Sequence, residues 1–117
     1  MTGEVKIGDK TVEMMTSGFL IPLYDRVFGR NLNEDIAFVG EANPGLTIDT
    51  SIKLAFLMCE QAKHPKPSDI GELLKLGEKQ FFEWINQFEP YELQNSSSEI
   101  MAFYTNSRKE KAKAKKE

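Results

Sequence analysis

Residues 52–59 read Ile-Lys-Leu-Ala-Phe-Leu-Met-Cys, and this apolar stretch decides the fold. Its apolar side chains surround most of the circumference of a helix, which is typical of a central, buried helix. We expect this helix to run from about Thr50 to Lys63, with Asp49 or Thr50 as its cap. The segment His64-Pro65-Lys66-Pro67 then ends it, because each proline disfavours helical geometry in the preceding residue.

At the N-terminal end of the chain, the pattern predicts a β-hairpin. Val5 and Ile7, and later Val12 and Met14, alternate with polar residues. Between the two runs lies Gly8-Asp9-Lys10, and glycine adopts the positive φ that tight hairpin turns require. A two-stranded hairpin is marginal in water, so its apolar face must pack against another element.

Between the hairpin and the central helix, two shorter helices are expected. The first begins near Ile21 and ends at Gly29, which places Pro22 in the first turn, where its missing N–H is tolerated. The second is a short helix over 34–39, with Asn33 as its cap and Gly40 at its end. A turn is expected at Asn43-Pro44-Gly45.

After the prolines, the chain returns to helical patterns. Ser68 and Asp69 restart a helix that extends to about residue 76, and Gly77 predicts a break. The segment 78–88 then carries one apolar stripe of Phe81, Trp84, Ile85 and Phe88, and Pro90 closes it.

A last helix is predicted from a capping box. Ser96-Ser97-Ser98-Glu99 has the serine-x-x-glutamate spacing whose reciprocal hydrogen bonds start a helix. This helix presents Ile100, Phe103 and Tyr104, and it should fray into the lysine-rich end of the chain.

Length and composition indicate one folded domain. The chain has 117 residues, of which 40% are hydrophobic, enough for a single core. We therefore expect a mainly α protein with a small N-terminal β-hairpin, an α+β arrangement in a compact bundle of about four to six helices. Residues 1–107 would form the globular domain, and residues 108–117 a basic, flexible tail.

Charge and cysteine content place the protein in the cytoplasm. The net charge is −3, so the whole chain has no general attraction to nucleic acid or to anionic membranes. A single cysteine, Cys59, forms no intrachain disulfide, and the first residues lack a signal-peptide pattern. The apolar stretches are far shorter than the roughly 20 residues that span a bilayer.

Chemistry-bearing motifs are scarce, so the sequence predicts a binding protein and not an enzyme. His64 and Cys59 lie five residues apart, a poor helical spacing for two groups that must meet. One cysteine and one histidine make no zinc pattern, and neither a calcium loop nor a phosphate loop is present. We predict no catalytic residue, no cofactor and no metal site.

Aromatic residues near the C-terminus are the candidate partner contacts. Phe81, Phe82 and Trp84 cannot all point the same way on one helix, so at least one should remain exposed as an interface anchor. Core packing is the competing explanation for each residue taken singly. The candidate set is Phe82, Trp84, Phe88, Tyr91, Phe103 and Tyr104.

The tail over 108–117 supports an alternative function. It contains six lysine or arginine residues against two glutamates, a composition that gives salt-sensitive contacts with phosphates. A small nucleic-acid-associated protein is therefore the second hypothesis. The acidic remainder of the chain and the absence of aromatic residues among the lysines favour a solubilising tail instead.

The order of these features resembles one family. The chain combines the hairpin Val-Lys-Ile-Gly-Asp-Lys-Thr-Val-Glu, a helix ending Leu-Tyr-Asp-Arg-Val-Phe-Gly, the central apolar helix, the segment Gln-Phe-Phe-Glu-Trp-Ile-Asn-Gln-Phe, and a last helix that runs from Tyr-Thr-Asn-Ser into the lysines. Over nearly its whole length it is similar to the tail assembly chaperones of long-tailed bacteriophages and prophages of Gram-positive hosts. The motifs that carry the resemblance are degenerate and non-catalytic.

The resemblance implies a function without catalysis. Such chaperones bind and solubilise the tape-measure protein in the host bacterial cytoplasm, self-associate, and are not expected in the mature virion. Many exist in a longer form, made by programmed frameshifting, whose extra domain recruits the tail-tube protein. On that basis this chain would be the short product, and codons for Lys115-Lys116 would form the slippery run.

Overall fold

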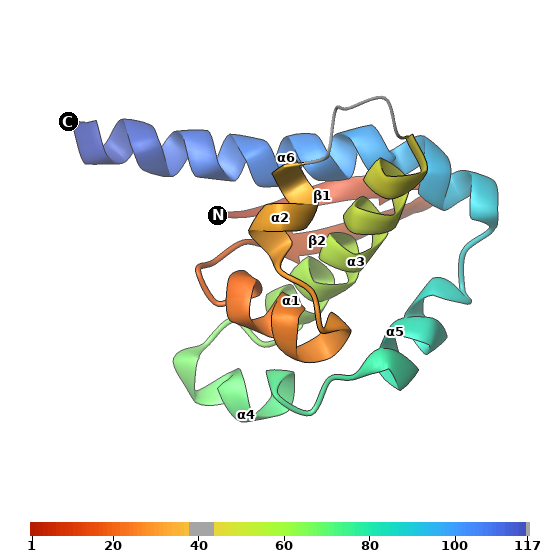
Figure 1. The fold of residues 1–117 in the computed structure, drawn as a ribbon, viewed down its shortest axis with the longest axis horizontal. Helices are drawn as coiled ribbons and strands as arrows, with labels where there is room; N and C mark the ends of the chain where they lie inside the picture. The colour runs from red at the N-terminus through yellow and green to blue at the C-terminus, as the bar shows by residue number, and fades with distance from the viewer. Residues whose placement is uncertain (38–43, 117) are drawn as a thin grey trace.

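The computed structural model describes the backbone of residues 1–37 and 44–116, and the side chains of residues 1–37 and 48–106. Its elements follow the chain as a hairpin and then six α-helices with one short 3₁₀ turn. Figure 1 shows α3 (Pro44–Lys63) in the middle, with the hairpin and α6 (Pro90–Lys116) along one side. The protein is thus mainly α with a small N-terminal hairpin, as the sequence predicts.

The hairpin forms where the alternating pattern predicts it. Strands β1 (Thr2–Ile7) and β2 (Lys10–Met15) are antiparallel, and Ile7 pairs with Lys10, which leaves a two-residue turn. The first turn residue, Gly8, has a φ of 62°, a conformation that costs glycine nothing. Val5, Ile7 and Met14 are buried, so the hairpin lies on the core through one face.

Helix α1 (Leu20–Phe28) has the predicted termini, with Pro22 in its first turn and Gly29 in a left-handed conformation at its end. Helix α2 (Leu32–Ala37) differs from the prediction at its start. Asn31, and not Asn33, is its cap, because the Oδ1 atom of Asn31 accepts a hydrogen bond from the backbone N–H of Glu34 at 3.0 Å. The predicted end of this helix at Val39–Gly40 lies outside the described residues.

A polar cluster joins α1 to α2. The Tyr24 hydroxyl donates to Asp35 Oδ2 at 2.7 Å, and the Arg30 guanidinium donates to both oxygens of the same carboxylate. Asp35 is only 2% exposed. Hydrogen bonds from Arg30 outweigh the effect of burial and lower the pKa of Asp35, whereas burial is the largest cause that raises the pKa of Tyr24. The cluster fixes α2 against α1.

The central helix is longer than the apolar pattern indicates. It begins at Pro44, so the expected start near Thr50 is wrong, and Pro44 and Gly45 of the predicted turn are helical, whereas Asn43 lies outside the described residues. Proline is well suited to the first helical position, where an N–H would have no intrahelical partner. The predicted burial is confirmed, since residues 54–59 are all buried.

Beyond α3, the chain forms a 3₁₀ turn (Pro67–Asp69), α4 (Ile70–Leu73) and α5 (Glu78–Ile85). The predicted break at Gly77 is confirmed, and this residue caps α5. Its backbone N–H donates to Gln80 Oε1 at 2.9 Å, so a side chain three residues into the helix satisfies the cap.

Pro90 begins the last helix, so the prediction that Pro90 only closes the preceding segment is corrected. Here Glu92 Oε1 accepts from the backbone N–H of Glu89 at 2.9 Å, the same cap as at α5. The predicted capping box at 96–99 is therefore wrong. Ser96 lies inside α6, and its hydroxyl lies 2.8 Å from the carbonyl oxygen of Glu92, one turn earlier. The side chains of the basic segment 108–117 lie outside those described.

Candidate partner-binding groove

Helix α5 and the turn after it bury three aromatic residues, two of which contact α3 directly. Phe81, Trp84 and Phe88, the last just beyond the helix, are each 8% exposed or less. The ring of Phe56 on α3 lies 5.5 Å from that of Phe81 and 5.9 Å from that of Trp84. The Phe88 ring meets Trp84 edge-on at 5.0 Å. This aromatic cluster confirms the predicted stripe and anchors α5 to the core.

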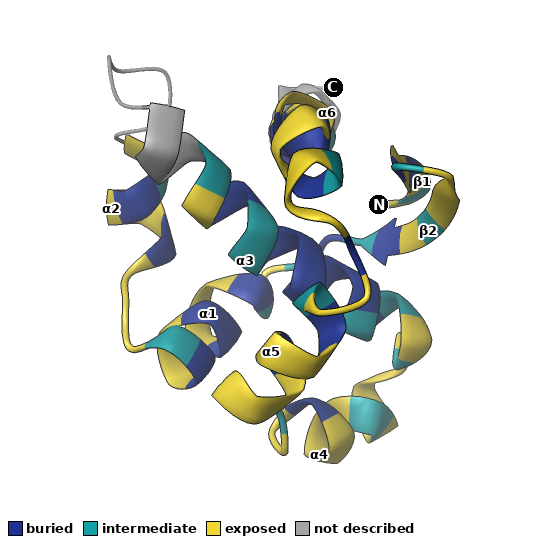
Figure 2. Cartoon of the chain, turned by 90° about the vertical axis from the view of Figure 1, so that its right-hand side faces the viewer, coloured by how far each residue is buried: buried dark blue, intermediate teal, exposed yellow. Residues whose placement is uncertain are grey.

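Two other aromatic residues of the same region point away from the core. Phe82, on α5, is 55% exposed, and Tyr91, in the first turn of α6, is 61% exposed. Phe82 directly follows the buried Phe81, and successive positions on a helix are about 100° apart, so the two rings cannot both face α3. Figure 2 shows that exposed residues occupy much of the outer side of α5.

Phe82 lies in an open groove of about 580 Å³ that three helices form together. Helix α3 contributes Ile48 and Ile52, and α5 contributes Phe82 and Ile85. The turn into α6 and its first residues supply the rest of the lining: Asn86, Phe88, Glu89, Pro90, Leu93 and Gln94. Ile48, Ile52 and Ile85 are half-buried, so their accessible portions form apolar surface inside the groove.

Glutamates outnumber lysines in the segment that borders the groove. Over residues 78–94 the chain has four glutamates, Glu78, Glu83, Glu89 and Glu92, and one lysine, Lys79. Glu89 lines the groove itself, and Glu83 and Lys79 flank Phe82 on its outer side. A partner that carries basic side chains beside an apolar stripe would match this edge in charge.

The structure separates the six candidate contact residues into three groups. Phe82 and Tyr91 are exposed. Phe103 is half-buried, and its ring lies against the backbone of Gly3. Trp84, Phe88 and Tyr104 belong to the buried core. Phe82 and Phe88 line the groove, and the other four candidate residues do not.

Sequence reasoning did not select the isoleucines that line the groove. Ile52 belongs to the central apolar run and Ile85 to the apolar stripe, so the pattern predicts both as core residues. Ile48 precedes the predicted start of the central helix. Their shared feature is intermediate burial at positions adjacent to a fully buried face. Periodicity identifies such boundary positions on one helix, but it does not show which boundaries of different helices meet.

The residues weighed for catalysis do not form a reactive pair. Cys59 is buried, and desolvation raises the pKa of its thiol to about 12, so the nucleophilic thiolate is scarce at neutral pH. His64 follows the end of α3 and is half-buried. Among the described residues, no group of three or more His, Cys, Asp and Glu side chains is gathered as metal ligands would be. No helix in the described part of the chain is long and apolar enough to cross a bilayer.

The chain matches no protein-family model, no curated protein and no solved structure.

Proposed function

We propose that this protein is a tail assembly chaperone, which binds an apolar helix of the tape-measure protein in the groove between α3, α5 and α6. The observation that carries the proposal is the apolar lining of that groove together with Phe82, a large aromatic side chain that is 55% exposed. Exposed aromatic residues beside a hollow are characteristic of surfaces that bind proteins.

The shape of the site supports a helical client. An amphipathic helix binds a groove through apolar side chains at every third or fourth position, and those side chains enter hollows between the helices of the binding protein. The lining isoleucines come from two helices, α3 and α5, so the apolar surface is distributed along the groove. A groove of this kind accepts an aliphatic stripe without demanding one sequence, as a chaperone requires.

The charge of the edge adds selectivity for client segments. The glutamates of residues 78–94 favour helices whose apolar stripe is bordered by lysine or arginine. Because such rim contacts are exposed, they alter association rates and salt dependence more than they alter affinity. Self-association of the chaperone would place many such grooves along one long client, and the resulting avidity compensates for weak single contacts.

The direct test is co-expression with a tape-measure protein encoded beside the gene. The wild-type chain should keep the client in the supernatant and co-purify with it. A Phe82→Ser/Tyr91→Ser double variant removes both exposed aromatic side chains of this region. We expect it to lower the amount of co-purified client at least about tenfold, the loss typical of two interface anchors.

A matched control uses exposed apolar residues that lie elsewhere on the surface. Ile21 and Ile70 are 40% and 39% exposed and do not line the groove. The Ile21→Ser/Ile70→Ser variant also replaces two exposed apolar side chains with serine and should retain the client. If the wild-type chain and both double variants co-purify equal amounts, the groove is not the binding site. If the wild-type chain binds no tape-measure protein, the proposed function is wrong.

A further inference from the structure

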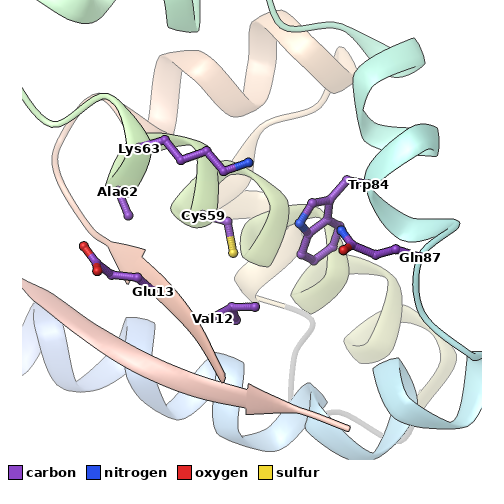
Figure 3. Close-up of a pocket in the computed structure, with 7 residues that line it drawn as sticks. All are labelled: Val12, Glu13, Cys59, Ala62, Lys63, Trp84 and Gln87. Atoms are coloured by element: carbon purple, nitrogen blue, oxygen red, sulfur yellow. The ribbon is translucent and has the colours of Figure 1, made fainter. Parts of the chain in front are cut away.

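A second hollow lies between α5, α3 and strand β2. It is a cavity of about 320 Å³, at the lower end of the range for small-molecule sites. Figure 3 shows its lining residues, which are Val12, Glu13, Cys59, Ala62, Lys63, Trp84 and Gln87. None of them lines the groove described above.

The buried polar group in this cavity is the indole of Trp84. Trp84 is 8% exposed, and its ring is held between Phe56 and Phe88 by aromatic contacts at 5.9 and 5.0 Å. Figure 3 shows the indole nitrogen on the edge of the ring that faces the cavity. Within the described residues, no side chain or carbonyl accepts this N–H, and Nε1 is not one of the buried atoms that lack a partner, so solvent in the cavity reaches it. An indole N–H is only a donor, so its natural partner is an acceptor atom inside the cavity.

Two further donors are available at the Trp84 end. Lys10 Nζ donates to Gln87 Oε1 at 3.4 Å, which occupies the amide oxygen and leaves the amide NH₂ of Gln87 for other acceptors. The side chain of Lys63 extends toward the same end in Figure 3. In its ion pair with Glu60, at 3.3 Å, the Lys63 side chain is 62% exposed, so solvent weakens the pair and the ammonium can exchange it for another anion.

The remaining walls are apolar, and the one carboxylate lies apart from the donors. Cys59 and Ala62 of α3 and, across from them, Val12 of strand β2 are the apolar part of the lining. Because burial raises the pKa of Cys59 to about 12, its thiol is neutral and adds no charge. Figure 3 places the Glu13 carboxylate at the end opposite Trp84 and Gln87. A ligand with an acceptor at one end only is therefore oriented in one direction.

We propose that this cavity binds a small apolar carboxylate. Its carboxylate group accepts hydrogen bonds from Trp84 Nε1, from the Gln87 amide and from Lys63 Nζ, while its hydrocarbon part packs on Val12, Ala62 and the indole ring. The carboxylate has enough lone pairs for all three donors, and the indole N–H, which otherwise meets only solvent, gains a charged acceptor. This site is separate from the groove, and the proposal does not depend on the chaperone function.

The test uses the single tryptophan of the chain as its reporter. Titration of the purified protein with 4-phenylbutyrate should change the emission of Trp84 in a saturable way, because the ligand contacts the indole directly. The matched cation 4-phenylbutylamine has the same hydrocarbon part but no acceptor. We expect it to bind at least about tenfold more weakly, which corresponds to the loss of one hydrogen bond to a charged group.

Two substitutions identify the cavity as the site. Ala62→Leu fills the apolar side and should abolish the saturable change, whereas Ala102→Leu, at an exposed position of α6, should leave it intact. Lys63→Met should weaken 4-phenylbutyrate but not the neutral 4-phenylbutan-1-ol. The proposal is overturned if no saturable change occurs, if the amine binds as tightly as the carboxylate, or if Ala62→Leu has no effect. A loss of client binding in the groove variants bears on the chaperone proposal alone.

Discussion

On one side of α3, the hairpin and α6 contact α3 and each other, and they completely bury residues such as Met14 and Ile100. On the other side, α5 covers α3 with the rings of Phe81 and Trp84 and leaves Ile85 half-buried and Phe82 exposed. We call these the closed side and the open side. The closed side is covered by the N-terminal part of α6 and two paired strands of six residues each, whereas α5 has eight residues.

The difference shows how surplus apolar surface arises in this fold. A helix of eight residues is about 12 Å long and presents one stripe to the core. It shields the centre of the neighbouring surface but not both margins, so the groove and the Trp84 cavity both border on α5. Both proposed binding sites therefore lie along the margins of α5, one where it meets α6 and one where it meets strand β2, and a partner or ligand completes the packing there.

The first contrast is between two isoleucines, one on each side. Ile100 is fully buried, so Ile100→Ala should lower the free energy of unfolding by about 2–5 kcal/mol through lost burial and a new cavity. Ile85 is half-buried at the groove, and Ile85→Ala should cost less than half as much. Urea unfolding monitored by circular dichroism measures both. Equal losses would show that the open side is packed as tightly as the closed side.

An intermediate loss of stability is expected at the polar cluster that joins α2 to α1. Asp35→Asn weakens the contacts with Tyr24 and Arg30 and should lower the free energy of unfolding at pH 7 by about 1–2 kcal/mol. The loss is no larger because solvent screens the exposed Arg30 guanidinium. The pKa of Asp35 is lowered, chiefly by hydrogen bonds from Arg30. Its contribution is therefore complete above the ordinary carboxyl pKa and is lost as the pH falls through the lowered value.

The pH series provides the control for this substitution. Unfolding free energies of the wild type and of Asp35→Asn should differ most at neutral pH, and the difference should shrink below about pH 4. Ile100→Ala serves as a reference, because the loss of an apolar group carries no pH dependence of its own. A gap between wild type and Asp35→Asn that stays constant down to about pH 2 would contradict the assigned role of the carboxylate.

The smallest effect is expected at the exposed ring. Phe82→Ala should change the free energy of unfolding by less than about 0.5 kcal/mol, as is usual for surface positions. The adjacent Phe81→Ala removes a ring that contacts both Phe28 and Phe56 and should cost about 3–5 kcal/mol. Thermal or urea unfolding of both variants measures these two changes in the free energy of unfolding. A large loss for Phe82→Ala would mean that its ring supports the fold and is not free for a partner.

The ends of helices and strands were predictable wherever the sequence offered one start or stop residue and no alternative nearby. Gly8, Gly29 and Gly77 mark the turn, the helix end and the helix start that the structure contains. Prediction failed where two local signals competed for one helix start. Pro90 and Ser96 are both residues typical of a helix start. Helix α6 begins at Pro90, because the Glu92 side chain accepts a hydrogen bond from the backbone N–H of Glu89 there.

The candidate site was predictable only in its location. The sequence directed attention to the aromatic residues after Gly77, and the groove includes two of the six candidates, Phe82 and Phe88. It did not reveal the contribution of Ile48 and Ile52, which come from α3, about thirty residues before α5 along the chain. Convergence of side chains from distant segments depends on how helices cross, and local pattern does not contain that information.

By itself, the sequence determined the identity of the elements: an alternating hairpin, a central apolar helix, and an aromatic stripe on a later helix. These follow from side-chain periodicity and from the backbone preferences of glycine and proline, which act over a few residues. Only the tertiary structure decided that Trp84 and Tyr104 are buried while Phe82 and Tyr91 face solvent. The reason is that burial depends on whether another segment covers a position, and α5 is too short to cover the whole open side.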